Sequence, residues 1–291
     1  MAEPSIAFIV NPKAGISNKR SLLKSLQESA SERPGWAIYQ TRYAGHATKL
    51  AKRALKEGYQ KIVAAGGDGT VNEVARALLH TGIPMGIIPV GSGNGLARHL
   101  RIPLDLPRAL KIIGGDQTIA IDAGLINGKH PFFCTAGVGF DAQVGKQFAQ
   151  AGQRGIMTYL KTIFEEYFTY KPQQYKITVD GRLLERKAFL ITLANASQWG
   201  NNAVIAPRAD IMDGMLDITI MSPFHPLEAP AVGILLITRN IDASGHTESL
   251  KGREIRIERD APGLIHCDGD AIELGSVITI QTLHHALTLL V

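Results

Sequence analysis

Cysteine is scarce in this sequence, and it has no long apolar run. Two cysteines occur among the 291 residues, Cys134 and Cys267, and neither belongs to a CxxC pair or to a zinc-like spacing with histidine. A reduced compartment without structural zinc is the simplest interpretation. The apolar stretch Ala229 to Thr238 is much shorter than the ~20 residues that cross a bilayer. Because Met1 to Ser5 carries no basic cluster either, we expect neither a transmembrane anchor nor a secretory signal.

The sequence has no long run of residues with the same charge. The net charge is +5, and the basic residues are scattered apart from Arg98, Arg101, Arg108 and Lys111. A basic balance favours an anionic partner, such as a nucleotide or a negatively charged membrane surface, although a generally solvated basic surface explains it equally well. Zinc-finger spacing and RNP-type aromatic motifs are missing, so nucleic acid is not an expected partner.

The first 120 residues alternate between strand and helix patterns. Short apolar runs predict buried strands at Ile6–Val10, Trp36–Tyr39, Lys61–Ala65 and Met85–Pro89. Helical patterns separate them at about Asn18–Ser31, His46–Glu57 and Val71–Leu79. Helices between short apolar strands indicate parallel crossovers, so we predict a doubly wound α/β domain with a mostly parallel sheet.

After Asp122 the pattern changes to strands with few helices between them. The expected strands are Tyr175–Val179, Ala188–Ala194, Leu216–Met221, Glu254–Glu258 and Val277–Thr282. Asp180-Gly181 is a strong signal for a two-residue hairpin turn. Helices are expected only at about Arg154–Phe168 and Leu227–Ile237. We therefore predict an antiparallel β domain, packed closely on the first because no Ser/Gly/Pro-rich linker is present.

Three turns rich in glycine or proline follow strands of the first domain. They are Asn11-Pro-Lys-Ala-Gly15, Gly66-Gly-Asp-Gly-Thr70 and Gly91-Ser-Gly-Asn-Gly95. In doubly wound sheets ligands bind at the carboxyl ends of the strands, and a glycine-rich helix start suits phosphate. Asp68 fits such a site if a magnesium ion lies between its carboxylate and the phosphates. Thr70 is available as a helix cap, Ser92 as a hydroxyl donor and Lys13 as a phosphate contact.

Each of these features also has an explanation that involves no ligand. Asp and Gly both favour turns, so Gly66 to Thr70 is also compatible with a bare turn, and Lys13 with a solvated side chain. The G-x-G-x-x-G dinucleotide fingerprint fails at Gly91 and at Gly93, and no G-x-x-x-x-G-K-[ST] is present.

The three turns extend into longer strings that resemble a known family. Asn-Pro-Lys-Ala-Gly, Gly-Gly-Asp-Gly-Thr-Val-Asn-Glu-Val and Pro-Val-Gly-Ser-Gly-Asn-Gly-Leu-Ala-Arg are similar, in order and spacing, to the diacylglycerol kinase catalytic-domain family. That family includes bacterial lipid kinases, sphingosine kinases and ceramide kinases, and the resemblance covers nearly the whole chain. The Ser-Gly-Asn-Gly-Leu-Ala string looks closer to sphingosine and ceramide kinases than the usual bacterial Thr-Ala-Asn-Asp-Phe-Ala does.

The resemblance implies a fold and a nucleotide site. The fold is a phosphofructokinase/NAD-kinase-like α/β domain, residues 1–122 with a last strand at about 285–291, and a β-sandwich domain, residues 123–284, with ATP and Mg²⁺ between them. The residues expected to hold the nucleotide are Asn11, Pro12, Lys13, Ala14, Gly15, Thr41, Gly66, Gly67, Asp68, Gly69, Thr70, Asn72, Glu73, Gly91, Ser92, Gly93 and Asn94.

The resemblance also implies roles for acidic residues outside the glycine-rich turns. Asp122 matches an acidic residue near the catalytic magnesium, whereas without the family it is an equally good strand-end turn residue. Asp268-Gly-Asp270 stands where the family has Asp-Gly-Glu, with one acidic residue as general base near the γ-phosphate. Asp270 replaces the usual Glu and has a shorter reach, and a plain hairpin turn is the alternative. The catalytic candidates are therefore Asp68, Asp122, Asp268 and Asp270.

One further turn, Asp210 to Met215, resembles a segment that binds a structural magnesium ion. Asp213 would supply the carboxylate, and Asp210 and Met215 would supply carbonyl oxygens. A plain Asp-Gly turn is the alternative.

The implied function is a magnesium-dependent lipid kinase that moves the γ-phosphoryl group of ATP to a lipid hydroxyl, as in phospholipid biosynthesis. Diacylglycerol or a related lipid is the expected acceptor. The alternatives are a sphingosine- or ceramide-type kinase, then an NAD kinase or sugar-phosphate kinase, or a catalytically inactive nucleotide-binding regulator, which the departure at Asp270 keeps open. We expect a cytoplasmic protein that meets its lipid transiently at the inner membrane surface, with a homodimer also compatible.

Overall fold

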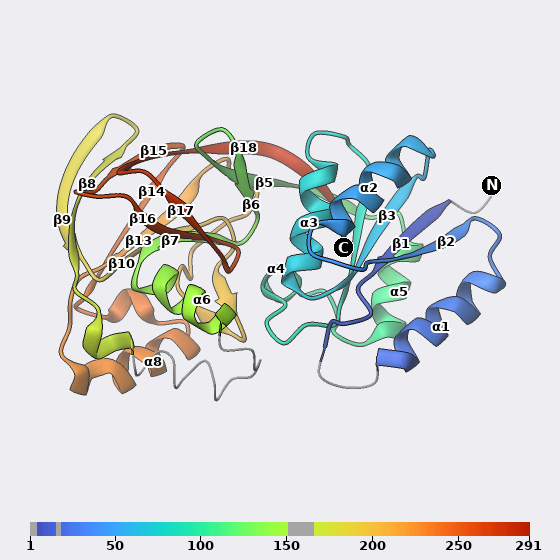
Figure 1. Ribbon diagram of the computed structural model, residues 1–291, viewed down its shortest axis with the longest axis horizontal. Helices are drawn as coiled ribbons and strands as arrows, with labels where there is room; N and C mark the ends of the chain where they lie inside the picture. Colours follow the sequence, from blue (N-terminus) through green and yellow to red (C-terminus); the bar gives the residue numbers. More distant parts are fainter. Residues whose placement is uncertain (1–4, 16–18, 151–165) are drawn as a thin grey trace. The chain divides into compact units, whose positions relative to one another are not determined.

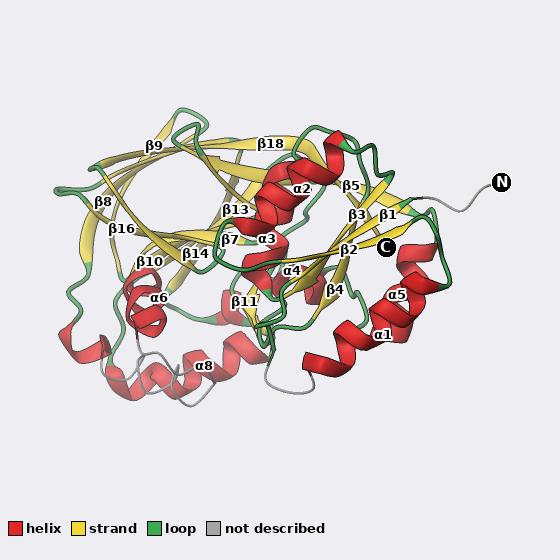
Figure 2. Ribbon diagram, turned by 45° about the vertical axis from the view of Figure 1, so that its right-hand side comes forward, coloured by secondary structure: helices red, strands yellow, loops and turns green. Residues whose placement is uncertain are grey.

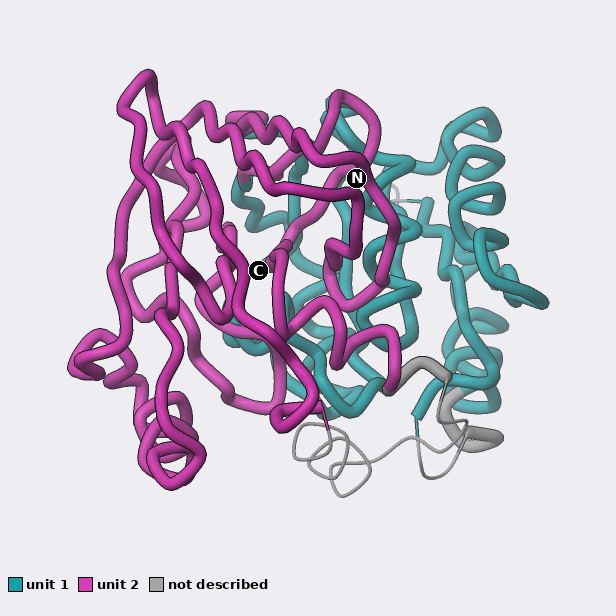
Figure 3. Tube along the Cα trace, turned by 60° about the vertical axis from the view of Figure 1, so that its left-hand side comes forward, with its two compact units in different colours: residues 1–121, 285–291 teal, residues 122–284 magenta. Residues whose placement is uncertain are grey.

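The computed structural model describes residues 5–15, 19–150 and 166–291. The chain divides into two compact units, shown in different colours in Figure 3. The first unit comprises Met1–Ile121 and His285–Val291, and the second comprises Asp122–His284. The domain limits expected from the sequence differ from these in one respect, since they assign Asp122 to the first unit. The chain enters the second unit within strand β5 (Thr118–Ile126) and leaves it within strand β18 (Val277–Leu290).

The first unit contains a parallel sheet in the order β2-β1-β3-β4, extended by the end of β18. The strands are β1 (Ile6–Val10), β2 (Trp36–Gln40), β3 (Lys61–Gly66) and β4 (Met85–Pro89). β1, β3 and β4 are buried throughout, because helices cover both faces of the sheet.

Among the described residues of this unit, five helices accompany the sheet. They are α1 (Lys19–Ser31), α2 (His46–Lys56), α3 (Asp68–Leu78), α4 (Gly95–His99) and α5 (Leu106–Gly114). Phe8 lies in one core cluster with Leu26 of α1 and Ile113 of α5. α2 and α3 pack against each other and against β1 and β3 (Figure 2). The unit is therefore a three-layer α/β fold, as predicted.

The second unit is a sandwich of two largely antiparallel sheets. One sheet contains β8 (Gln173–Val179), β9 (Arg182–Ala188) and β15 (Glu254–Glu258) beside β18, with β5 and β6 (His130–Phe132). The other contains β7 (Thr135–Gly139), β10 (Leu190–Ala194), β13 (Leu216–Met221), β14 (Thr247–Gly252), β16 (Gly263–Cys267) and β17 (Asp270–Leu274). Ile177 of the first sheet and Ile218 of the second belong to one buried core. The predicted β-sandwich is thus confirmed.

Short elements complete the second unit. They are α6 (Phe140–Gln150), α8 (Ala229–Ile237), the 3₁₀ turns η1 (Pro226–Glu228) and η2 (Ile241–Ala243), and the small hairpin of β11 (Gln198–Gly200) and β12 (Ala203–Val204). Across the described parts of both units, no helix has the length and apolar character needed to cross a membrane.

Two Asp-Gly pairs form two-residue hairpin turns in the second unit. Asp180 and Gly181 join β8 to β9 with φ of 47° and 84°, and Asp268 and Gly269 join β16 to β17 with φ of 50° and 90°. Positive φ at both positions matches the right-handed twist of the flanking strands. The hairpin predicted at Asp180-Gly181 is therefore confirmed.

Several element limits differ from the prediction. α3 begins at Asp68 rather than at Val71, so the Gly-Gly-Asp-Gly turn runs directly into the helix. The expected strand Ala188–Ala194 is split, since β9 ends at Ala188 and β10 begins at Leu190. β18 joins the two last expected strands into one. Helix α5 was not anticipated, and most of the helix expected at about Arg154–Phe168 lies outside the described residues.

Arg259, directly after β15, links the ends of β16 and β17 from a buried position. Its guanidinium donates to the carbonyl oxygens of Gly263 (2.6 Å), Leu264 (2.8 Å) and Leu274 (2.9 Å). Burial lowers the pKa of this guanidinium, but four carbonyl acceptors, that of Gly275 at 3.2 Å included, compensate its charge.

We expect Arg259→Met to lower the free energy of unfolding by roughly 2–3 kcal/mol, because several partly buried carbonyls lose a charged donor. Thermal and urea unfolding would measure the loss. Arg256→Met is the matched control on β15, since the exposed Arg256 side chain bonds only to Glu258 among the contacts described. Equal melting temperatures for the two variants would show that the carbonyl contacts of Arg259 add nothing.

Candidate functional site

The turns after β3 and β4 are joined through the side chain of Asp68. Its Oδ2 accepts the backbone N–H of Asn94 at 2.9 Å, and its Oδ1 accepts that of Gly95 at 2.7 Å. Both turns lie at the carboxyl ends of parallel strands, where such sheets bind ligands (Figure 1). Asp68 therefore fixes the spacing between the two glycine-rich turns. Its carboxylate is half-buried and is turned toward the second turn.

Glycine is needed at several positions of these turns because their backbones are in close contact. A Cβ on Gly91 would lie 2.7 Å from the Cα of Gly67, and a Cβ on Gly93 would lie 2.7 Å from Oδ2 of Asp68. Gly15, with φ of 82°, would place a Cβ 2.7 Å from the carbonyl oxygen of Val90. The three turns after β1, β3 and β4 thus form one closely packed cradle.

The turn after β1 is connected to helix α3 through Asn11. The amide nitrogen of Asn11 donates to Oγ1 of Thr70 at 3.2 Å, and its Oδ1 accepts the N–H of Lys13 at 2.9 Å. The expectation that Thr70 caps the helix is wrong, since the N-cap is Gly67 and makes no side-chain cap bond. The helix starts three residues earlier than a Thr70 cap would require.

Glu73 stabilises the start of helix α2. Its carboxylate accepts the N–H of Gly45 at 2.6 Å and that of Ala47 at 2.9 Å, and its carbonyl accepts the hydroxyl of Thr48. Gly45 has φ of 84°, a conformation that suits glycine. These contacts explain Glu73 as a capping residue, so its predicted part in nucleotide binding rests on the resemblance alone.

The remaining predicted nucleotide residues of the first unit differ in exposure. Lys13, Gly69 and Ser92 are exposed, whereas Thr70, Asn72 and Asn94 are buried. Thr41 follows β2, and its N–H bonds to the carbonyl of Val10. The structure thus brings the predicted residues into one region of the sheet edge, with an ammonium and a hydroxyl on its exposed side.

Asp268 of the second unit serves as an acceptor for backbone N–H groups. Its Oδ1 accepts from Cys134 (2.8 Å) and Thr135 (3.0 Å), and its Oδ2 accepts from Phe133 (2.9 Å). The N–H of Asp268 in turn donates to the carbonyl of Thr135. The hairpin alternative is thus correct as a description of the backbone, and Asp268 ties this hairpin to the segment before β7.

Asp270 has a different environment from Asp268. It is the first residue of β17, lies opposite Cys267 in the hairpin, and is exposed. Of the two acidic residues in Asp-Gly-Asp, Asp270 presents its carboxylate at the surface of the unit, where a carboxylate is accessible to a hydroxyl group. The structure therefore gives these two acidic residues different surroundings.

Asp122 is completely buried at the start of the second unit. Its Oδ2 accepts the N–H of Gly214 at 2.6 Å, and its Oδ1 lies 2.8 Å from Nδ1 of His284. The amide nitrogen of Asn195 donates to the carbonyl oxygens of Asp122 (2.8 Å) and Phe133 (2.9 Å). His284 and Asn195 were missed in the sequence, because each is separated from Asp122 by many residues and belongs to no motif.

The turn Asp210 to Met215 gives its acidic side chains partners from the protein. Oδ1 of Asp210 accepts the N–H of Met212, and Oδ1 of Asp213 accepts the N–H of Met215, each at 3.0 Å. Oδ2 of Asp213 lies 2.6 Å from Nζ of Lys251. Lys251 was not predicted as a partner of this turn. Nothing in the sequence at Asp210, Asp213 or Met215 indicates that a lysine lies beside them.

The same ammonium group lies 3.2 Å from Oδ2 of Asp217. Burial raises the pKa of Asp217 although Lys251 opposes the shift. Burial lowers the pKa of Lys251, but its contacts with the two aspartates outweigh this effect and raise the pKa overall. At neutral pH the ammonium therefore keeps its positive charge.

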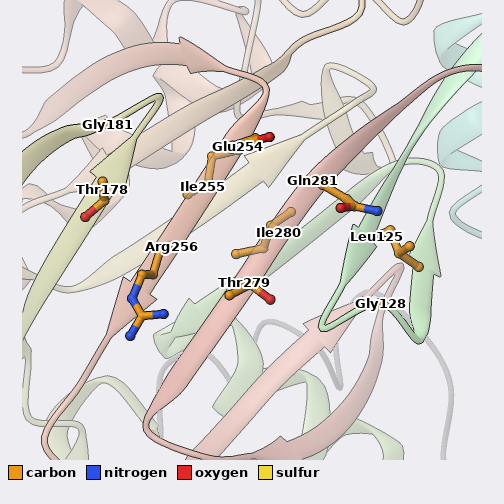
Figure 4. Close-up of a pocket in the computed structure, with 10 residues that line it drawn as sticks. All are labelled: Leu125, Gly128, Thr178, Gly181, Glu254, Ile255, Arg256, Thr279, Ile280 and Gln281. Atoms are coloured by element: carbon orange, nitrogen blue, oxygen red, sulfur yellow. The ribbon is translucent and has the colours of Figure 1, made fainter.

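A separate hollow of about 440 Å³ lies on the second unit (Figure 4). Strands β8, β15 and β18 and the β5–β6 turn line it, with the polar side chains of Thr178, Glu254, Arg256 and Thr279. None of the predicted site residues lines this hollow.

Two family models match the chain. The model for the diacylglycerol kinase catalytic domain matches residues 5–126, and that for the YegS C-terminal NAD kinase beta sandwich-like domain matches residues 134–291. A diacylglycerol kinase from Bacillus subtilis is 30% identical over 274 residues, which cover 90% of this chain and 88% of that protein. An uncharacterized Synechocystis protein is 31% identical over 285 residues, and the chain spans 65% of its length.

Solved structures agree with the fold. A diacylglycerol kinase from Bacillus anthracis has a TM-score of 0.77 at 24% identity, with 99% of this chain and 96% of that chain covered. An NAD kinase from Archaeoglobus fulgidus, in complex with ATP, has a TM-score of 0.54 at 10% identity, with 98% and 93% covered. The fold is thus one that kinases share.

The chain belongs to the diacylglycerol kinase family, whose members also include enzymes described as lipid kinases. The resemblance seen in the three glycine-rich strings is confirmed. The class is that of a lipid kinase.

We expect Gly91→Ala to lower the melting temperature and Gly69→Ala to leave it unchanged or slightly higher. The Cβ at residue 91 would meet the backbone of Gly67, an overpacking that costs about 1–3 kcal/mol. The Cβ at residue 69 has no neighbour within 4 Å and lies in a helix. Thermal unfolding of both variants without ligand measures this, and a Gly91→Ala protein as stable as its Gly69→Ala control would contradict the close packing.

We expect Asp268→Asn to lower the free energy of unfolding by about 2 kcal/mol and Asp270→Asn to change it little. An amide at residue 268 turns a donor toward one of three backbone N–H groups that now meet a carboxylate. Asp270 is exposed, and surface substitutions usually cost within about 0.5 kcal/mol. Urea unfolding curves would compare the two, and the idea fails if the losses are equal.

Proposed function

We propose that this protein transfers the γ-phosphoryl group of ATP to the hydroxyl group of a lipid, with diacylglycerol as the first candidate acceptor. The observation that carries the proposal is the cradle of three turns, locked together by Asp68 and by glycine contacts, in a chain that belongs to the diacylglycerol kinase family. Backbone N–H groups and glycines at a helix start are suited to phosphate groups.

ATP is the phosphoryl donor in this proposal. Lys13 and Ser92 offer an ammonium and a hydroxyl group on the exposed side of the cradle, and Gly67 and Gly69 let phosphate oxygens approach the backbone. The NAD kinase of the same fold holds ATP, which supports the choice of nucleotide. Positioning and charge stabilisation by such groups account for most of the catalysis of phosphoryl transfer.

Magnesium would enter with the nucleotide. Kinase magnesium is commonly held by one or two carboxylates together with phosphate oxygens and water. Asp68 fits this pattern, because each of its oxygens accepts one N–H group and retains a lone pair. When bound, the ion would neutralise charge on the phosphate oxygens.

Asp270 is our candidate for the general base. Its carboxylate is exposed, whereas both oxygens of Asp268 accept backbone N–H groups. A general base has to reach the proton that it removes, and Asp268 has its hydrogen-bonding capacity directed at the backbone. We assign Asp268 the role of holding the hairpin in which Asp270 sits.

A sphingosine- or ceramide-type acceptor is the second candidate. Gly95 stands where the usual bacterial string has Asp, and its N–H donates to Asp68. A Cβ at Gly93, two residues before Gly95, would lie 2.7 Å from Oδ2 of Asp68. Both kinds of acceptor offer a hydroxyl group on a lipid, and we propose that the protein meets them at a membrane surface.

The test is transfer of radiolabelled phosphate from ATP to diacylglycerol, ceramide or sphingosine in mixed micelles, with NAD⁺ in a parallel reaction. We expect a labelled lipid product that requires Mg²⁺. Asp270→Asn should lower the rate by at least about 100-fold, and Asp270→Glu should retain substantial activity. The proposal fails if NAD⁺ alone is phosphorylated, or if none of the acceptors is labelled by a correctly folded protein.

A further inference from the structure

The turn Asp210 to Met215 contains a feature that distinguishes this chain from the magnesium-binding segment it resembles. In that segment a cation is held by one carboxylate and by backbone carbonyls. Here an ammonium group, Nζ of Lys251, lies 2.6 Å from Oδ2 of Asp213, and Oδ1 of the same residue accepts the N–H of Met215. Each oxygen of the expected metal ligand therefore has a partner within the protein.

The position of Lys251 follows from the register of the sheet. β13 and β14 are antiparallel, and Lys251 lies directly opposite Asp217. Residues opposite each other across strands have neighbouring side chains, and opposite charges there are favourable. Asp213 lies just before β13, so one ammonium group contacts the carboxylates of both aspartates.

Burial makes this positive charge important. The side chain of Asp217 is 11% exposed, that of Asp213 is 22% exposed and that of Lys251 is 32% exposed. Oδ2 of Asp217 is buried and has no hydrogen bond of good geometry within the described parts of the chain, so its contact with Lys251 is one of charge. Two partly buried carboxylates need a compensating cation, and the lysine supplies it.

A metal ion and this ammonium group would compete for the same oxygen. Mg²⁺ requires close to octahedral coordination by oxygen at about 2.0–2.1 Å. An ion at that distance from Oδ2 of Asp213 would face a positive charge bound to the same atom, and like charges this close repel strongly. The donor set of this turn does not fit magnesium while Lys251 is in place.

We propose that Lys251 takes the place of a structural cation in this chain, so that the second unit is stabilised at the Asp210–Met215 turn without a metal ion. The ammonium group provides the positive charge and up to three hydrogen-bond donors, with no need for water ligands.

The turn held by Lys251 also contacts Asp122. The N–H of Gly214 donates to Oδ2 of Asp122, and the carbonyl of Ile211 accepts the N–H of Asp122. The turn held by Lys251 therefore also fixes the backbone that surrounds this buried carboxylate. Lys251 acts here as a positioning residue for the turn.

The experiment is thermal unfolding of the full chain without nucleotide or lipid, in EDTA and then in millimolar MgCl₂ at matched ionic strength. A metal bound only to the native state raises the melting temperature by mass action. We expect the magnesium response of the natural protein to equal that of Asp213→Asn. We expect Lys251→Met to melt several degrees lower in EDTA and to recover at least half of that loss in MgCl₂, because the two aspartates then lack a cation.

Two controls make the result specific. Lys176→Met removes a lysine whose ion pair with Glu185, at 3.7 Å, is exposed, and it should show no extra magnesium response. Asp213→Asn combined with Lys251→Met should abolish the recovery. The proposal is overturned if the natural protein gains more from magnesium than Asp213→Asn does, or if Lys251→Met gains no more than the Lys176→Met control. The natural protein and Asp213→Asn decide the matter even if Lys251→Met fails to fold. Because no nucleotide or lipid is present, the result is independent of the proposed kinase activity.

Discussion

The pairing of carboxylates with backbone N–H groups of distant segments is the constraint on which both units depend. A buried or half-buried N–H must find an acceptor, and in turns that lack sheet or helix partners the acceptor has to be a side chain. The acidic residues that accept in this way are Asp68, Glu73, Asp122, Asp180 and Asp268. Each joins a turn to a segment that lies far away in the sequence. The turns keep their shape because a carboxylate can accept hydrogen bonds from more than one direction.

Because of this constraint, an acidic motif in such a fold is compatible with a structural role and with a catalytic role. Asp68 and Asp268 stand in strings that resemble catalytic motifs, and both bind backbone N–H groups in the structure. The sequence motif alone does not distinguish a residue that holds the backbone of a site from a residue that takes part in its chemistry. The two acidic residues of the second hairpin differ in exposure, since Asp270 is exposed and Asp268 is partly buried.

Much of the fold could be predicted from the sequence, because periodic apolar runs and Asp-Gly turns are local signals. The four parallel strands and the hairpin at Asp180 were found in this way. The start of α3 was misplaced, since glycines in Gly-Gly-Asp-Gly mask a helix that tertiary contacts support. Partners such as His284 and Lys251 could not be found, because they depend on strand register between segments far apart along the chain. The convergence of the three glycine-rich turns was therefore predictable, whereas the partners of the acidic side chains were not.

The division of the chain has a consequence for biosynthesis. The sheet of the first unit includes the end of β18, where Leu289 pairs with Met85 and the carbonyl of Ala286 accepts the N–H of His80. A ribosome delivers β4 long before it delivers β18, and all of the second unit is made between the two. Until then β4 presents an open edge, which favours pairing with other chains. The sheet of the first unit is therefore complete only after β18 has been made.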